Sequence, residues 1–124
     1  MSKVDIPGGD TASAVLHVIS EQTTVTTVSG EHDISTMHLL VEALVRAGER
    51  PNAIVDLTPC TFLDSSILGV LFTACRDQQP GNRFELVLPE RESGVKRAID
   101  LTGVRDVMTV HETLAEALRS VGEA

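Results

Sequence analysis

Short apolar runs alternate with stretches of helical periodicity along nearly the whole chain, and this alternation constrains the fold more than any other feature. Two runs rich in β-branched residues come first, at residues 14–19 and 23–28, and follow each other directly. A helical stretch separates each later run from the next, as is typical of parallel strands joined by right-handed crossovers. The sequence therefore predicts one α/β domain with a mixed, mostly parallel β-sheet, an N-terminal strand pair and about four α-helices.

The expected helices are marked by apolar residues spaced three and four positions apart. The first has such a stripe from Met37 to Val45, with Ser35 as its N-cap candidate. Two more helices are expected at residues 65–77 and 93–101. A last amphipathic helix carries Leu114, Ala117, Leu118 and Val121. Buried strands are expected between the helices at residues 53–57 and 84–88, and a short final strand is expected at residues 107–110.

Composition sets limits on location and partners. The length of 124 residues fits one domain, expected at residues 13–121 behind a flexible N-terminal arm at residues 1–12. A net charge of -8 disfavours binding to nucleic acid or to an anionic membrane surface. No run approaches the roughly 20 apolar residues of a membrane span, and no secretory leader opens the chain. A cytoplasmic location is therefore expected.

The segment after the strand at residues 53–57 carries the residues most suited to chemistry. Asp64, Ser65 and Ser66 place one carboxylate and two hydroxyl groups where the second helix begins. Loops beyond the carboxyl ends of parallel strands are where such sheets place functional groups. Asp64 or Ser65 can serve simply as a helix N-cap. A phosphate on Ser65, in contrast, would meet the unpaired N–H groups of a helix N-terminus.

Three segments together resemble the signature of a known family. Residues 54–66, Ile-Val-Asp-Leu-Thr-Pro-Cys-Thr-Phe-Leu-Asp-Ser-Ser, resemble the motif of the bacterial anti-sigma factor antagonists, whose domain is called STAS. Residues 30–33, Gly-Glu-His-Asp, are similar to the family's Gly-Glu-x-Asp. Residues 95–104 are similar to its third-helix segment, which ends in Thr-Gly. The resemblance runs from about Ala14 to Leu118, with every element in order.

The resemblance implies a switch protein that is not an enzyme and needs no cofactor. In that family the antagonist binds an anti-sigma factor, often a serine kinase, and so frees a sigma factor for transcription. Phosphorylation of the serine after the motif's aspartate dissociates the complex, and a phosphatase resets it. Carried over by position, Ser65 is the phospho-acceptor, and a monomer or weak homodimer is expected. The implied partner-binding residues are Asp33, Asp64, Ser66, Ile67 and Leu68.

One position departs from the family pattern. Ile67 follows the two serines, where the family most often has glycine, and adds a β-branched side chain in the first helical turn. We expect this bulk to face the docking partner and to select among anti-sigma factors. Ile67 also supports an alternative, a scaffold or ligand-sensing STAS module in a regulatory complex, in which Ser65 is not phosphorylated.

The remaining candidate residues do not form an enzyme-like pattern. Asp56 resembles the phospho-acceptor of a response-regulator receiver, but the acidic pair that holds Mg²⁺ and the lysine after the last strand are missing. The four histidines lack nucleophile–base spacing with Ser65, and we expect them to be solvent-facing or locally hydrogen-bonded. No metal site is expected. Cys60 and Cys75 are expected to be packing residues, with a redox pair beside the Ser65 loop as the alternative.

Overall fold

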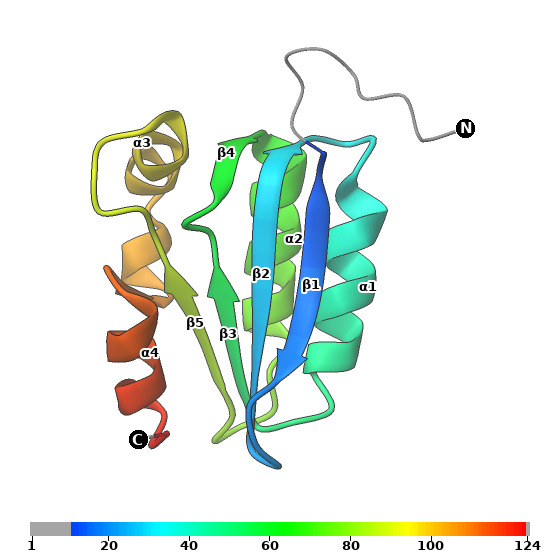
Figure 1. The fold of residues 1–124 in the computed structure, drawn as a ribbon, viewed down its shortest axis with the longest axis vertical. Helices are drawn as coiled ribbons and strands as arrows, with labels where there is room; N and C mark the ends of the chain where they lie inside the picture. Colours follow the sequence, from blue (N-terminus) through cyan, green and yellow to red (C-terminus); the bar gives the residue numbers. More distant parts are fainter. Residues whose placement is uncertain (1–10, 124) are drawn as a thin grey trace.

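The computed structural model describes residues 11–123 and arranges them as a six-stranded mixed sheet with helices on its faces (Figure 1). The strands are β1 (Ser13–Val18), β2 (Thr23–His32), β3 (Asn52–Asp56), β4 (Cys60–Leu63), β5 (Arg83–Val87) and β6 (Thr109–His111). The helices are α1 (Met37–Ala47), α2 (Ser65–Arg76), α3 (Gly94–Leu101) and α4 (Leu114–Ser120), with a short 3-10 helix η1 (Val104–Asp106). This arrangement confirms the predicted α/β fold.

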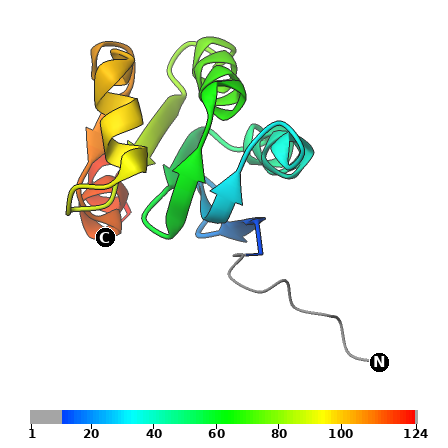
Figure 2. The same ribbon diagram turned by 90° about the horizontal axis from the view of Figure 1, so that it is seen from above.

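The sheet has the order β1-β2-β3-β5-β6, and only β1 runs antiparallel to its neighbour. The carboxyl ends of the parallel strands therefore lie at one edge, at the top of Figure 1. α1 and α2 lie on one face of the sheet and α4 on the other (Figure 2). Because strand residues alternate between faces, Val55 of β3 packs in the larger core beneath α1 and α2, and Ile54 packs in the smaller core beneath α4.

The prediction that a loop alone connects β3 to α2 is wrong, because this segment contains the extra strand β4. The chain turns after β3, where the Thr58 N–H donates a hydrogen bond to Oδ1 of Asp56 (2.9 Å). β4 then pairs in parallel with the end of β2, beyond the part of β2 that pairs with β3. β2 bulges at Gly30, whose φ of 82° and close approach to the Thr11 carbonyl leave no room for a Cβ atom. β4 thereby delivers Asp64 to the carboxyl edge of the sheet.

Other predicted boundaries shift by a few residues. Thr36 precedes the first turn of α1, so the prediction of Ser35 as N-cap is wrong, and Thr36 makes no side-chain capping hydrogen bond. β6 begins at Thr109 rather than at residue 107, because η1 and the turn after it occupy the preceding residues. Of the arm predicted at residues 1–12, residues 1–10 lie outside the described residues.

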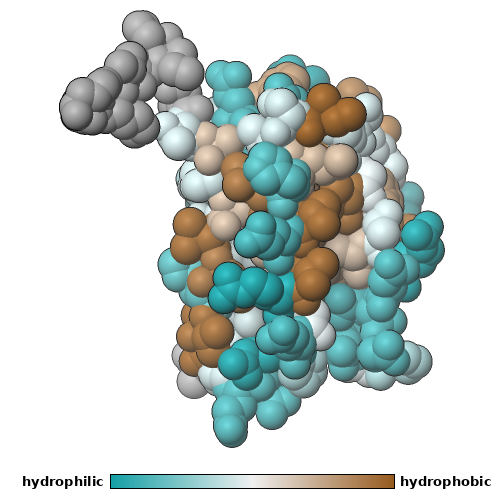
Figure 3. Space-filling view, turned by 90° about the vertical axis from the view of Figure 1, so that its right-hand side faces the viewer, coloured by the Kyte–Doolittle hydropathy of each residue, from teal (hydrophilic) through white to brown (hydrophobic). Residues whose placement is uncertain are grey.

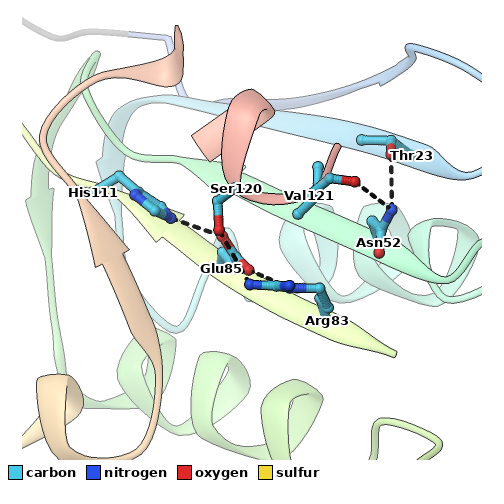
Figure 4. Close-up of polar contacts among 7 residues, drawn as sticks. All are labelled: Thr23, Asn52, Arg83, Glu85, His111, Ser120 and Val121. Atoms are coloured by element: carbon cyan, nitrogen blue, oxygen red, sulfur yellow. Dashed lines mark hydrogen bonds and ion pairs between the residues drawn. The ribbon is translucent and has the colours of Figure 1, made fainter. Parts of the chain in front are cut away.

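A polar cluster fixes α4 against the sheet (Figure 4). The carboxylate of Glu85 in β5 is buried and accepts hydrogen bonds from Nε of Arg83 and Nε2 of His111, both at 2.7 Å. Arg83 also donates to the Ser120 hydroxyl of α4 (3.1 Å). A buried carboxylate needs such partners, because burying it unpaired costs several kcal/mol, on the order of 3–5. The cluster therefore joins β5, β6 and α4.

The first turn of α2 anchors that helix in the larger core. Ile67 and Leu71, one turn apart, are both fully buried, and Leu68 is nearly so. Ile67 is therefore a packing residue, and its side chain does not reach the surface. None of the helices within residues 11–123 has the length and apolar character to span a bilayer.

Replacing Ile67 with alanine tests this packing role. Removing a fully buried isoleucine side chain leaves a cavity that the surrounding residues fill only in part, so we expect the free energy of unfolding to fall by about 2–5 kcal/mol. Urea unfolding followed by circular dichroism measures the change. Leu101→Ala is the matched control, because Leu101 is 80% exposed, and it should change the value by less than about 0.5 kcal/mol. An Ile67→Ala protein as stable as the control would contradict the assignment.

Candidate functional site

Asp64 is the N-cap of α2 and fixes where the helix begins. Its backbone is extended, and Oδ1 accepts hydrogen bonds from the backbone N–H groups of Ser66 (3.0 Å) and Ile67 (3.3 Å). The Ser66 hydroxyl donates to the same oxygen. The predicted capping role therefore belongs to Asp64, and Ser65 is the first residue of the helix.

The two serines lie in different surroundings. Ser65 is exposed, and its hydroxyl has no hydrogen-bond partner within the described part of the chain. Ser66 is half-buried, donates to Asp64 and lines the groove between α1 and α2. A hydroxyl that forms part of a helix cap is less free to react than one that faces solvent. The geometry therefore distinguishes Ser65 as the accessible hydroxyl.

The loop between β2 and α1 lies beside this helix start. Oδ1 of Asp33 accepts hydrogen bonds from the Ser35 N–H (2.9 Å) and from the Ser35 hydroxyl (2.6 Å). The backbone of Ile34 in the same loop contributes to lowering the pKa of Asp64, and the charge of Asp64 in turn acts on Asp33. The pairing of His32 with Leu63 brings together two segments that belong to separate motifs in the sequence, so Asp33 and Asp64 lie at one edge of the sheet.

A buried histidine holds the loop onto the sheet. Nε2 of His32 donates to the backbone carbonyl of Ser29 (2.9 Å), and Nδ1 lies 3.1 Å from the Thr36 hydroxyl. The ring is fully buried, so its hydrogen bonds are needed to offset the loss of solvation. The prediction of local hydrogen bonding is confirmed for this histidine.

Hydrogen bonds keep both carboxylates ionised. The pKa of Asp64 lies below its ordinary value, chiefly because the Ser66 hydroxyl donates to it and also because backbone N–H groups do. The pKa of Asp33 is lowered by the hydroxyl and N–H of Ser35, although the negative charge of Asp64 acts in the opposite direction. The sheet edge beside Ser65 therefore carries two negative charges at neutral pH.

The structure brings some of the predicted partner-binding residues to the surface and buries others. Asp33 is exposed, and Asp64 and Ser66 are half-buried beside Ser65. Ile67 is fully buried and Leu68 is only 8% exposed. The prediction that Ile67 and Leu68 contact a partner is therefore wrong for the folded chain, because both side chains pack in the core.

Sequence reasoning missed two exposed apolar residues at this edge. Ile34 is 70% exposed in the loop beside Asp64, and Phe62 is 48% exposed in β4. Large apolar side chains that stay exposed together are typical of contact surfaces. The exposure of Phe62 could be inferred from the sequence only if residues 60–63 were first recognised as a strand.

The two cysteines are free thiols and lie in different segments. Cys60 in β4 donates to the Phe62 carbonyl (3.3 Å), and Cys75 near the end of α2 donates to the Val107 carbonyl (3.7 Å). Burial raises the pKa of the Cys60 thiol to about 11 and also raises that of Cys75, so both are protonated at neutral pH. No cluster of three or more metal-ligating side chains occurs among residues 11–123.

Replacing Ser66 with alanine tests how the Asp64 charge is held. The variant loses the hydrogen bond that contributes most, so the pKa of Asp64 should rise toward its ordinary value of 3.8. The pKa of Asp33 should stay low, because Ser35 still donates to it. Carboxyl titration by NMR measures both values, with Ser65→Ala as the matched control.

The sign of the accompanying change follows from linkage. A lowered carboxylate pKa adds stability above the unfolded-state pKa, and this stability is lost as the pH falls through the folded-state pKa. The acid-induced loss of the cap should therefore occur at higher pH in Ser66→Ala than in the wild type. An Asp64 titration identical in the two proteins would show that the Ser66 hydroxyl does not hold this charge.

Comparisons with known proteins identify the family and the fold. The family model of the STAS domain matches residues 15–117. None of the curated proteins matches the chain. Among solved structures, an anti-sigma factor antagonist from Mycobacterium paratuberculosis is 28% identical and superposes with a TM-score of 0.82. That match covers 95% of this chain and 98% of the other.

Two more distant structures share the fold. SpoIIAA of Bacillus in its phosphorylated form is 20% identical with a TM-score of 0.67, covering 88% of this chain and 99% of the other. An anti-sigma-factor antagonist (STAS) domain protein from Planctomyces limnophilus is 17% identical with a TM-score of 0.70, covering 91% and 100%. Because the family model spans well over half of the residues, from 15 to 117, the chain belongs to the STAS domain family.

Proposed function

We propose that this STAS domain is an anti-sigma factor antagonist that is switched off by phosphorylation of Ser65. The observation that carries the proposal is the exposed, unpartnered Ser65 hydroxyl at the start of α2. The similarity to a 28% identical anti-sigma factor antagonist supports the same role. In its unphosphorylated form the protein binds an anti-sigma factor in the cytoplasm and so frees a sigma factor. It acts by binding rather than by catalysis.

The phosphate comes from ATP through an anti-sigma factor that is itself a serine kinase. The Ser65 oxygen attacks the γ-phosphorus, the bond from that phosphorus to the ADP oxygen breaks, and the hydroxyl proton passes to a base on the kinase. A phosphatase later hydrolyses the phosphoserine with water, which restores the hydroxyl and releases inorganic phosphate. This chain supplies the acceptor hydroxyl and an accessible helix start.

The helix start offers the phosphate few free donors, which revises the expectation formed from the sequence. The N–H groups of Ser66 and Ile67 already donate to the Asp64 carboxylate, and the Leu68 N–H donates to the Asp64 carbonyl (3.2 Å). Phosphorylation therefore adds a charge of about -1.5 to -2 beside two carboxylates, with little compensation from this chain. A partner that covers Ser65 has to desolvate this charge, so its binding weakens.

The burial of Ile67 removes the reason for preferring a scaffold that is not phosphorylated. That alternative depended on an exposed β-branched side chain between the partner and Ser65. Ile67 packs in the core instead, so the departure from the family's glycine leaves the surface around Ser65 open. We therefore retain the phosphorylation switch as the proposed function.

Phosphorylation of Ser65 is tested by incubating the protein with its cognate anti-sigma kinase and ATP. Intact mass should show one added phosphate on the wild type and on Ser66→Ala, and none on Ser65→Ala. Ser66→Ala is the matched control, because it removes the neighbouring hydroxyl but keeps that of Ser65. Phosphate on Ser65→Ala, or none on the wild type with a kinase shown to be active, would overturn the switch.

Binding of the anti-sigma factor should respond to charge at the same position. By calorimetry, Ser65→Ala should bind as tightly as the unphosphorylated wild type, because a methyl group adds no charge. Ser65→Asp should bind about tenfold more weakly or worse, since like charge and desolvation oppose docking. Equal affinities for the two variants would place Ser65 outside the interface.

A further inference from the structure

A groove runs between α1 and α2, along the helices that cover the larger core. It has a volume of about 530 Å³, and its lining is mostly apolar, including Met37, Val41, Leu44, Val70 and Phe84. Val41 and Val45 at its border are 40% and 69% exposed. Figure 3 shows apolar side chains gathered in strips on this side of the molecule, with hydrophilic residues between them. Such a groove is open to a second apolar surface.

Charged residues lie on α1 next to the exposed Val41 and Val45, on the side of the helix away from the groove. Glu42 and Arg46 are both exposed, lie one helical turn apart and have opposite charges. Neither forms an ion pair with another residue in the part of the chain that the structure describes. His38, one turn before Glu42, is also exposed, and so is Glu49, which follows the end of α1.

This pattern is self-complementary about a two-fold axis. When two copies of α1 pack antiparallel with the axis near Leu44, Glu42 of each copy lies opposite Arg46 of the other. A two-fold axis that passes between the two helices leaves equivalent sides of the two copies next to each other. The groove side of one α1 therefore lies beside the groove side of the other. Val41 of each copy then approaches Val45 of the other, and His38 approaches Glu49.

We propose that the α1 surface, formed by Met37, Val41, Leu44 and Val45 with Glu42 and Arg46, is the interface of a homodimer. Two copies bury their exposed valines against each other's groove, and two symmetric Glu42–Arg46 pairs set the antiparallel register. The occupant is a second copy because its Arg46 and Glu42 are opposite in charge to the Glu42 and Arg46 that they face across the axis. The proposal goes beyond the proposed function and does not depend on phosphorylation, because Ser65 is not part of the α1 surface.

Sedimentation velocity over a range of protein concentrations tests the dimer. The wild type should shift from monomer toward dimer as concentration rises, with the same dissociation constant for Ser65→Ala. Val45→Glu should weaken the dimer about tenfold or more, because it places a carboxylate in the apolar contact. Leu101→Glu is the matched control: Leu101 is 80% exposed on α3, away from α1, and the substitution should leave the dissociation constant unchanged.

A charge exchange tests the register. Glu42→Arg and Arg46→Glu should each weaken the dimer about tenfold, because each places like charges opposite one another across the axis. The double variant Glu42→Arg/Arg46→Glu restores opposite charges in both pairs and should dimerise within a few-fold of the wild type. All of these positions are exposed, and circular dichroism confirms that each variant is folded.

Three results would overturn the proposal. The first is a wild type that stays monomeric up to millimolar concentration. The second is a dimer that Val45→Glu leaves intact or that the double variant fails to restore. The third is a monomer whose binding to a purified anti-sigma factor is weakened by Val45→Glu, which would assign the groove to that partner instead. Each is distinguishable from failure of the switch, which is read from the mass of Ser65-phosphorylated protein.

Discussion

The hydrogen bonds from the first turn of α2 to the Asp64 carboxylate determine the placement of the α2 residues at the candidate site. They fix the helix start, so Ser65 takes the first helical position and Ile67 turns toward the core. A start one residue later would rotate each side chain by about 100° around the helix axis, since a turn holds 3.6 residues. The exposed hydroxyl is thus a consequence of the cap. The same bonds occupy the N–H groups that a phosphate would otherwise use.

Periodicity in the sequence was enough to predict the α/β order, because each helix and each buried strand carries its own apolar pattern. β4 could not be found in this way, since its four residues follow a proline and pair with an extension of β2 whose register shifts at Gly30. The burial of Ile67 was within reach of the sequence. It lies one turn before Leu71, and apolar residues one turn apart in an amphipathic helix share the face that packs on the core.

Contacts between segments that are distant in the sequence decide which polar side chains meet, and periodicity alone does not predict these contacts. Glu85 is buried in β5 because Arg83 and His111 donate to it, and the His111 contact depends on β6 lying beside β5. Asp33 and Asp64 belong to separate motifs, which the family resemblance assigned to one partner-binding set, and the parallel pairing of β2 with β4 is the contact that brings them to one edge. Residue type identifies such groups as candidates, but strand order decides which of them meet.

The sign of a phosphorylation switch depends on what the partner places over Ser65. A partner that brought a cluster of lysine or arginine side chains to this edge would bind the phosphorylated form more tightly, because the edge already carries the ionised Asp33 and Asp64. The exposed Ile34 and Phe62 favour a contact with an apolar component instead. In such a contact the phosphate loses its solvation without gaining an ion pair, and the energetic cost of desolvating it exceeds any screened attraction at the rim. In the proposed switch, the exposed apolar residues at this edge, more than the charge of the phosphate alone, would make phosphorylation of Ser65 a release signal.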